Sequence, residues 1–298
     1  MLLLKNFYIY ILCFTSICCT ISKKGNSNIL YAKDIEKLIQ KGLPVIIEDK
    51  TIMGDLNFLN NSQAVPLNLN VEVVYLNSSI NFKNCEFKGT LSCVTTNNNV
   101  KKVGVFQKHI SIINCKFLEN FNLYGCSILG DAIFENNTFY KQAIFENSFF
   151  LKGINFEETV FKGEAFLQNI VFNGYTSFFK AAFDTTVNFQ QSKFNSEVNF
   201  NVVTFNGYAE FGITDFGAKT FFNYTKFYKA VFFNNARFRD IATFNNTSFN
   251  QCNFVNAAFF LTPLFINIKV IENLNFKTCT FIGHKPMFDN ALTSKIIY

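Results

Sequence analysis

Phenylalanine recurs through the middle of the chain at alternating gaps of five and six residues. One series occupies positions 134, 145, 156, 178, 189, 200, 211, 222, 233 and 244, with Leu167 in its single gap. A second series occupies positions 139, 150, 161, 172, 183, 194, 205, 216, 227, 238 and 249. Because side chains alternate along a strand, gaps of mixed parity would send successive rings to opposite faces of a continuous strand. The chain must therefore turn between consecutive phenylalanines, with each ring pointing inward.

An eleven-residue apolar period is also typical of helices that wind into a right-handed supercoil. On a helix, however, the two series would lie on faces about 140° apart instead of on one seam. The residues between the phenylalanines are mostly Asn, Thr, Val, Ser and Gly, which form helices poorly. The pattern therefore predicts an all-β protein.

The residues around each phenylalanine complete a short repeating unit. Residues two apart share one face of a strand, and a small or β-branched residue lies two positions before most of the rings: Ala132, Ala143, Thr176, Ala181, Val187, Val198, Val203, Ala209, Thr220, Val231, Ala236 and Ala242. Asn and Gly tolerate the positive φ of tight corners, and they follow many of the rings: Asn173-Gly174, Asn206-Gly207, Asn234-Asn235, Asn245-Asn246, Asn195, Asn201 and Asn250. Each unit is predicted to be a very short strand, a phenylalanine and a corner.

The stretches ATFNNTSFNQCNF (242–254) and AVFFNNARF (230–238) resemble the pentapeptide-repeat family, in its Phe-centred variety with alternating five- and six-residue units. The resemblance is strong from Ile112 to Phe260 and weak at Ile80–Phe87 and Leu274–Phe281. It implies a right-handed, four-sided (quadrilateral) parallel β-helix with four units and about 22 residues per coil. Periodicity alone leaves open a flatter, two-sided coil of eleven residues.

The chain divides into five segments on this pattern. Residues 1–22 combine one Lys with a short apolar stretch, which predicts a secretory signal peptide, with an uncleaved signal anchor as the alternative. A lipid-modified Cys18 or Cys19 is a further alternative, although TSIC and SICC lack the Leu that such signals prefer three residues earlier. We therefore expect export to the periplasm, the cell surface or the medium, with membrane contact only through an uncleaved anchor.

Residues 23–79 are expected to cap the open end of the solenoid, because a bare end exposes unpaired backbone. Ile35, Leu38 and Ile39 predict a short amphipathic helix, with Gly42 as its stop. This helix and the GDL turn after it resemble the segment that precedes the first coil in the family. An irregular first coil at 80–111, a regular β-helix at 112–260 and a C-terminal partial coil and cap at 261–298 follow.

Six of the nine cysteines lie beyond the leader. Five of them fill the small-residue position two before an inward residue, where a thiol fits as a small apolar group: Cys85, Cys115, Cys126, Cys252 and Cys279. Interior thiols are therefore predicted for the set, which Cys93 completes. An even number of cysteines in an exported chain leaves disulfides as the alternative, with Cys115 and Cys126 as the first pair to examine.

Charge and candidate chemistry argue against several functions. The net charge of +6 comes from scattered residues, without the basic patch of a nucleic-acid-binding protein. His109 and His284 lie far from any Cys or carboxylate at metal-ligand spacing, and no nucleophile or phosphate-binding motif is found. We expect no catalytic residue, no metal and no cofactor.

Aromatic residues outside the inward positions form a candidate partner surface, or else a side wall shielded by its neighbours: Tyr140, Phe149, Tyr208, Phe221, Tyr224, Tyr228 and Phe232. The sequence thus predicts an exported, non-catalytic scaffold whose side walls bind a protein or an envelope component. The alternative comes from the family resemblance, since some members imitate duplex DNA and protect topoisomerases. That role needs a strongly acidic rod, so the basic charge and the leader oppose it.

Overall fold

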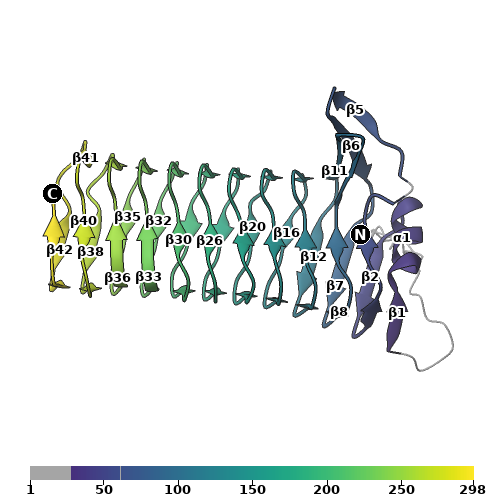
Figure 1. Ribbon diagram of the computed structural model, residues 1–298, viewed down its shortest axis with the longest axis horizontal. Helices are drawn as coiled ribbons and strands as arrows, with labels where there is room; N and C mark the ends of the chain where they lie inside the picture. Colours follow the sequence, from purple (N-terminus) through teal and green to yellow (C-terminus); the bar gives the residue numbers. More distant parts are fainter. Residues whose placement is uncertain (1–27, 61) are drawn as a thin grey trace, which may run out of the picture.

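The structure is a computed structural model that describes residues 28–60 and 62–298. It is a long parallel β-solenoid with one helix, α1 (Ala32–Gln40), at its N-terminal end (Figure 1). The predicted signal peptide, with Cys18 and Cys19, lies outside the described residues.

Three sheets run along the solenoid. Sheet A contains 21 strands: β1 (Ile29–Tyr31), β3 (Thr51–Met53), β4 (Leu56–Asn57), β8 (Glu86–Phe87), β9 (Leu91–Ser92), β13 (Lys116–Phe117), β14 (Phe121–Asn122), β17 (Thr138–Phe139), β18 (Ala143–Ile144), β21 (Val160–Phe161), β22 (Ala165–Phe166), β25 (Ala182–Phe183), β26 (Val187–Asn188), β29 (Thr204–Phe205), β30 (Ala209–Glu210), β33 (Lys226–Phe232), β36 (Ser248–Asn253), β39 (Lys269–Val270), β40 (Leu274–Asn275), β43 (Leu292–Thr293) and β44 (Ile296–Ile297).

Sheet B contains 11 strands: β2 (Val45–Glu48), β7 (Ile80–Lys83), β12 (Ile110–Ile113), β16 (Ala132–Ile133), β20 (Ile154–Asn155), β24 (Thr176–Ser177), β28 (Val198–Asn199), β32 (Thr220–Phe221), β35 (Ala242–Thr243), β38 (Leu264–Ile266) and β42 (Met287–Asp289). Sheet C contains 12 strands: β5 (Val65–Asn68), β6 (Val71–Leu76), β10 (Val94–Asn97), β11 (Val100–Phe106), β15 (Ser127–Ile128), β19 (Phe149–Phe150), β23 (Val171–Phe172), β27 (Lys193–Phe194), β31 (Asp215–Phe216), β34 (Arg237–Phe238), β37 (Ala258–Phe259) and β41 (Thr280–Phe281).

Each regular coil contributes four short strands, one to sheet B, two to sheet A and one to sheet C. Strands of successive coils pair in parallel, and the register joins residues 22 positions apart, as where Lys116 and Phe117 pair with Thr138 and Phe139. This register confirms the predicted coil length and excludes the coil of eleven residues. Four strands per coil are consistent with a four-sided cross-section.

The core consists of phenylalanine rings stacked along the solenoid axis. Ring centroids of successive coils lie 4.6–5.7 Å apart. The members fall into four columns: Phe87, Phe117, Phe139, Phe161, Phe183, Phe205, Phe227 and Phe249; Phe134, Phe156, Phe178, Phe200, Phe222, Phe244, Phe265 and Phe288; Phe150, Phe172, Phe194, Phe216, Phe238, Phe259 and Phe281; and Phe189, Phe211, Phe233, Phe254 and Phe276. The inward placement of both phenylalanine series is therefore confirmed.

The small-residue positions also hold buried hydroxyl groups. Thr225, for example, donates a hydrogen bond from Oγ1 to the backbone carbonyl of Phe200, at 2.6 Å. Ser148 and Ser192 donate in the same way to Leu123 and Leu167, each at 2.7 Å. Each of these carbonyls belongs to the preceding coil, so these buried hydroxyl groups are satisfied between coils.

Corners with positive φ recur every eleven residues along the regular coils. They lie in the five-residue gaps, at positions 136, 147, 158, 169, 180, 191, 202, 213, 224, 235 and 246, with φ between 53° and 63°. The prediction was correct at Asn235 and Asn246. It was wrong at Gly174 and Gly207, which lie in six-residue gaps and have no positive φ. Asn195, Asn201 and Asn250 have no positive φ either.

Gly207 is needed for close approach between coils. A Cβ atom there would lie 2.2 Å from the carbonyl carbon of Thr185 in the preceding coil, whereas a Cβ at Gly212 would meet nothing closer than 3.6 Å. We expect Gly207→Ala to reduce the free energy of unfolding by about 1–3 kcal/mol through overpacking. Gly212→Ala, as the matched control, should leave it nearly unchanged. Denaturant unfolding of both variants measures the difference, and equal stabilities would contradict this role.

Ile213 occupies a positive-φ corner, with φ of 60°, and its side chain is 56% exposed, so little packing is lost when it is replaced. A β-branched residue is strained in this region, at a cost of about 1–2 kcal/mol, whereas Asn tolerates it. We therefore expect Ile213→Asn to raise the free energy of unfolding by about 1 kcal/mol. The control is Ile241→Asn, because Ile241 is exposed but has no positive φ. If both substitutions change the melting temperature equally, the strain does not exist.

Helix α1 covers the N-terminal end of the solenoid, as the sequence indicated. Ala32, Ile35 and Ile39 are buried in the common core, and Gly42, with φ of 64°, follows the helix end. The buried Glu36 carboxylate accepts hydrogen bonds from the backbone N–H of Asn57 (2.9 Å). It also accepts one from the Asn60 side-chain amide, so the helix is tied to the first coil.

Candidate functional site

Two hairpins near the N-terminal end interrupt the regular solenoid. Strands β5 and β6 pair antiparallel, as do β10 and β11, while β6 and β11 pair in parallel. We call these four strands the hairpin tier; they project away from the rod (Figure 1). The sequence prediction assigned residues 23–79 to a cap and 80–111 to an irregular first coil, and it named neither hairpin. A signal was present at Asn98-Asn99, where two consecutive positive φ values form the kind of turn that joins hairpin strands.

Strand β5 exposes apolar side chains at the edge of the hairpin tier. On β5 itself, Leu67 is 66% exposed and Val65 about half exposed; Leu69, in the turn that follows, is 94% exposed, and Tyr75 on β6 is about half exposed. In the part of the chain that the structure describes, β5 pairs with β6 alone, so its other edge is open. An open strand edge with exposed apolar side chains is a surface on which partners dock.

The base of the hairpin tier is anchored in the core. Val74 and Leu76 of β6 and Phe106 of β11 are buried there. Above them, Lys102 and Glu72 form an ion pair at 3.4 Å between the two parallel strands. The hairpin tier is therefore anchored by buried apolar residues at its base, while its outer strand is exposed.

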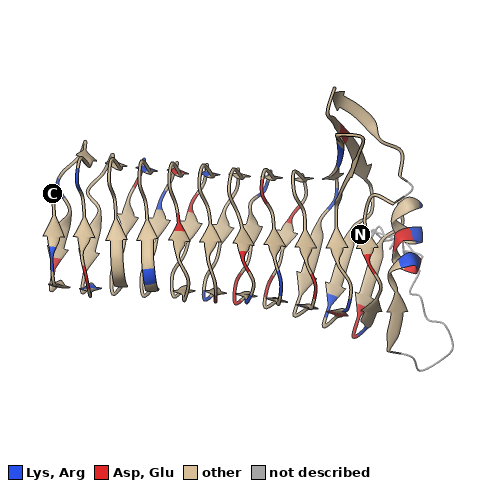
Figure 2. Ribbon diagram, in the orientation of Figure 1, with Lys and Arg blue, Asp and Glu red and all other residues tan. Residues whose placement is uncertain are grey.

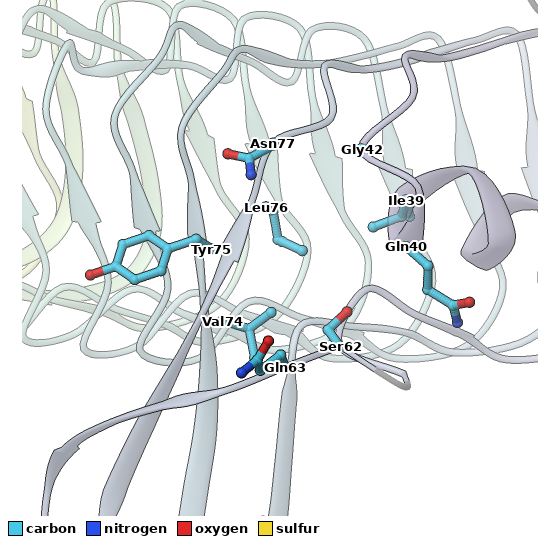
Figure 3. Close-up of a pocket in the computed structure, with 9 residues that line it drawn as sticks. All are labelled: Ile39, Gln40, Gly42, Ser62, Gln63, Val74, Tyr75, Leu76 and Asn77. Carbon is cyan, nitrogen blue, oxygen red and sulfur yellow. The ribbon is translucent and has the colours of Figure 1, made fainter.

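A small open hollow lies between the end of α1 and the base of β6 (Figure 3). Its volume is about 210 Å³, and its walls include Ile39, Gln40, Gly42, Leu76 and Asn77. No carboxylate, histidine or thiol lines it, so its polar groups are amides, hydroxyls and backbone. The hollow offers hydrogen bonds but no acid–base or nucleophilic group.

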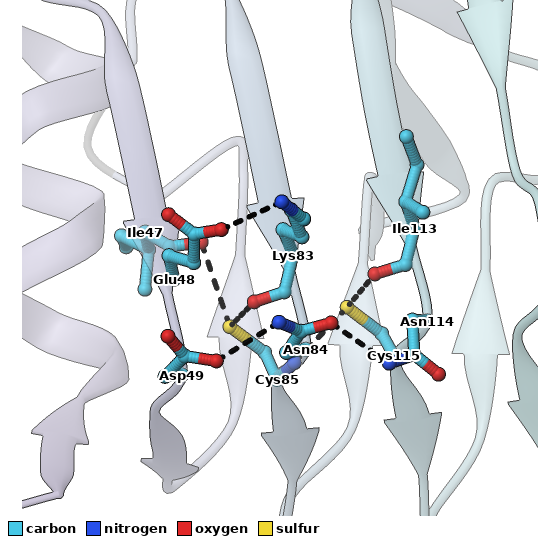
Figure 4. Close-up of polar contacts among 9 residues, drawn as sticks. All are labelled: Ile47, Glu48, Asp49, Lys83, Asn84, Cys85, Ile113, Asn114 and Cys115. Atoms are coloured by element: carbon cyan, nitrogen blue, oxygen red, sulfur yellow. Dashed lines mark hydrogen bonds and ion pairs between the residues drawn. The ribbon is translucent and has the colours of Figure 1, made fainter.

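Two cysteines meet in adjacent coils beside this end of the solenoid (Figure 4). The backbone N–H of Cys85 donates to the sulfur of Cys115 at 3.4 Å. The contact with the Cys115 thiol lowers the pKa of Cys85, and the same contact together with burial raises the pKa of Cys115. Around the pair, Glu48 binds Lys83 at 2.9 Å, and Asn84 donates to Asp49 at 2.9 Å.

A second pair of cysteines lies nearby. The Cys126 thiol donates to the backbone carbonyl of Cys93 at 3.4 Å. The Cys93 sulfur occupies the space that a Cβ atom at Gly104 would need. The structure therefore brings Cys85 to Cys115 and Cys93 to Cys126, rather than Cys115 to Cys126. Cys115 and Cys126, the first pair to examine, do not meet because they lie eleven residues apart on different walls of one coil, before β13 of sheet A and β15 of sheet C.

All six cysteines of the described chain are free thiols. Five of them are buried, which confirms the predicted interior positions, while Cys279 in the last coils is half-buried. Burial raises the pKa of Cys252 above its ordinary value and that of Cys279 to about 12. These two thiols therefore remain protonated at neutral pH.

The seven aromatic residues of the candidate partner surface are spread over three sheets. Phe149 lies on β19 of sheet C, Phe221 on β32 of sheet B and Phe232 on β33 of sheet A, each half-buried between neighbouring strands. The exposed members are the four tyrosines: Tyr140, Tyr208, Tyr224 and Tyr228. Tyr208 lies between β29 and β30 of sheet A, and Tyr228 lies within β33 of the same sheet, one coil later. A partner surface at these residues stays a prediction.

Charged residues of both signs are scattered along the walls (Figure 2). Lys180 pairs with Glu158 at 3.0 Å, and Arg239 binds both carboxylate oxygens of Asp215. His109 Nε2 lies 3.1 Å from the Asn81 amide, and His284 is exposed. Among residues 28–60 and 62–298 no group of three or more His, Cys, Asp or Glu could hold a metal ion. The helix described over these residues, α1, has nine residues, and no helical segment there has the length and apolar character of a membrane span.

A comparison with protein-family models gives no match for this chain, and a comparison with curated proteins gives none either. The molecule is a parallel β-solenoid whose phenylalanines recur at about every fifth residue, which is consistent with a pentapeptide repeat.

Proposed function

We propose that this chain is a pentapeptide-repeat protein that acts as an exported, non-catalytic scaffold and binds a partner protein or envelope component. The observation that carries the proposal is the hairpin tier. It joins exposed apolar side chains, led by Leu67 and Leu69, to an open strand edge on a rigid rod. Such surfaces are costly to leave bare, and they mark sites of association.

The arrangement of the charged groups supports a scaffold rather than an enzyme. Several wall carboxylates each pair with a single cation of a neighbouring coil, as in the pair of Lys180 with Glu158 and that of Arg239 with Asp215. An acid–base site needs groups whose environments set different pKa values around one substrate position. The mixed charges along the rod also argue against a DNA mimic, which needs a dense row of negative charge.

Export is tested by expressing the full chain with a C-terminal tag in a host with a secretory pathway. We expect the tagged protein outside the cytoplasm, with a mass reduced by roughly that of the first 22 residues. An intact protein that remains in the cytoplasmic fraction would contradict the export part of the proposal.

Partner binding is tested with a photo-crosslinking amino acid at Leu69 of the tier, and with the same group at Leu151 as the control. Leu151 is an exposed apolar residue of the regular wall, 41% exposed. We expect one discrete crosslinked product from Leu69 and at least about fivefold less from Leu151, because the tier offers the larger apolar surface. Stronger crosslinking from Leu151 would place the partner on the side walls, and no product from either position would contradict scaffolding.

A further inference from the structure

The coil that carries the second hairpin is longer than the regular coils. In sheet A, β8 pairs with β13 so that Glu86 faces Lys116, thirty positions on, whereas regular coils pair residues 22 positions apart. The extra residues form β10 and β11. Cys85 and Cys115 directly precede the two paired strands, so they mark the start and the end of this enlarged coil.

We propose that Cys85 and Cys115 form a disulfide that links these two coils when the chain folds under oxidising conditions. The oxidant is a disulfide, either an oxidised low-molecular-mass thiol or a thiol–disulfide oxidoreductase. Cys85, as a thiolate, attacks one sulfur of the oxidant and releases the other as a thiol, leaving a mixed disulfide. Cys115 then loses its proton and attacks the Cys85 sulfur, which releases the second thiol. One protein dithiol and one oxidant disulfide thus give one protein disulfide and two thiols.

The geometry suits this bond. Neighbouring parallel strands lie about 4.8 Å apart, within the range of about 4.4–6.8 Å that disulfides span between α-carbons. The two cysteines occupy equal positions before paired residues, and both side chains point into the core. The Cys115 sulfur already faces the neighbouring coil, 3.4 Å from the backbone nitrogen of Cys85. The Cys85 thiol donates to the carbonyls of Ile47 and Lys83, so one side-chain rotation brings it toward that sulfur.

The surroundings select the direction of attack and its timing. Once the coils of Cys85 and Cys115 have paired, and before the N-terminal coil covers them, the Cys115 contact lowers the pKa of Cys85 and favours its thiolate as the attacking group. Both residues are at most 2% exposed, and the preceding coil covers Cys85, whose thiol donates to the Ile47 carbonyl at 3.6 Å. The oxidant therefore reaches the pair before the N-terminal coil closes, and the finished solenoid then protects the bond.

The bond would fasten the foot of the hairpin tier to the rod. A load applied to the tier by a partner would otherwise pull on the few short strands of one enlarged coil. The alanine seen at the equivalent position of a later coil, Ala181, shows that the position itself does not need sulfur.

The test folds the reduced, denatured chain in buffer with oxidised glutathione and then blocks free thiols. Trypsin places Cys85, Cys93, Cys115 and Cys126 on separate peptides, at residues 84–88, 89–101, 109–116 and 117–141. We expect peptides 84–88 and 109–116 to be joined, with an intact mass about 2 Da below that of the reduced chain. The folded, reduced chain should oxidise at least about tenfold more slowly, because the pair is then buried.

Matched variants separate the bond from folding itself. The oxidised wild-type chain should melt about 5–10 °C above the reduced one, and this difference should vanish in Cys85→Ala but persist in Cys252→Ala. Free thiols at both positions after oxidative folding would overturn the proposal. A bond between any other two peptides, or a melting difference that survives in Cys85→Ala, would overturn it as well.

Discussion

Replacing Phe200 with alanine is expected to lower the free energy of unfolding by about 3–5 kcal/mol, as the loss of a large buried aromatic does. The ring is fully buried and stacks between Phe178, at 4.9 Å, and Phe222, at 4.7 Å. It also meets the edges of Phe189 and Phe211, each at 5.5 Å. Neighbouring rings are fixed by their own columns, so they cannot move to fill the cavity.

Lys193→Ala is the control for this prediction. Lys193 lies on β27 of sheet C, one residue before the buried Phe194, and its side chain is exposed. An exposed substitution of this kind should cost about 0.5 kcal/mol or less. Denaturant unfolding followed by circular dichroism compares the two variants, and equal costs would contradict the inward columns.

The regular solenoid could be predicted from the sequence because its restraints are local and repeated. Each unit of five or six residues contains an inward phenylalanine, a small residue two positions before it and a corner. The register of the sheets then follows from the length of the repeat. The short helix was predictable for the same reason, since Ile35, Ile39 and the Gly42 stop lie close together. The handedness, the four sides and the choice between coils of 22 and eleven residues rested on the family resemblance, and the structure decided the coil length.

The hairpin tier was missed because it follows a different rule. Its strands lack the phenylalanine repeat, and its position depends on pairing between β6 and β11, which lie far apart in the sequence. The contact between Cys85 and Cys115 was missed for the same reason, because a prediction from regular spacing does not include the inserted hairpin. The sequence prediction explained Gly207 by a positive φ, whereas the structure explains it by close contact with the backbone of the preceding coil. A local sequence pattern does not contain that contact.

Deleting Gln191 alone is expected to damage the protein more than deleting eleven residues, from Gln190 to Phe200. Gln191 is the positive-φ corner, at 61°, between Phe189 and Phe194. Its removal leaves a gap of four residues, too short to keep both the corner and two inward rings. The strands of the coil that follows are then out of register with the coil before the deletion, to which they pair.

The longer deletion keeps every local rule. Phe189 is then followed by Asn201 and Val202, and Val202, with φ of 63°, takes the place of the lost Gln191 corner. Phe205 takes the place of Phe194, five residues after Phe189. Later units move to the opposite wall, which has the same inward rings and small residues. Since solenoid stability is roughly a sum over units and their interfaces, the loss is about half a coil.

Thermal melting of these two purified variants, followed by far-ultraviolet circular dichroism, tests most directly whether phenylalanine spacing sets the coil. We expect the Gln191 deletion to lower the melting temperature by about 10 °C or more, and the eleven-residue deletion by less than about half of that. If the eleven-residue deletion instead melts at the lower temperature, the spacing does not set the coil and the account is contradicted.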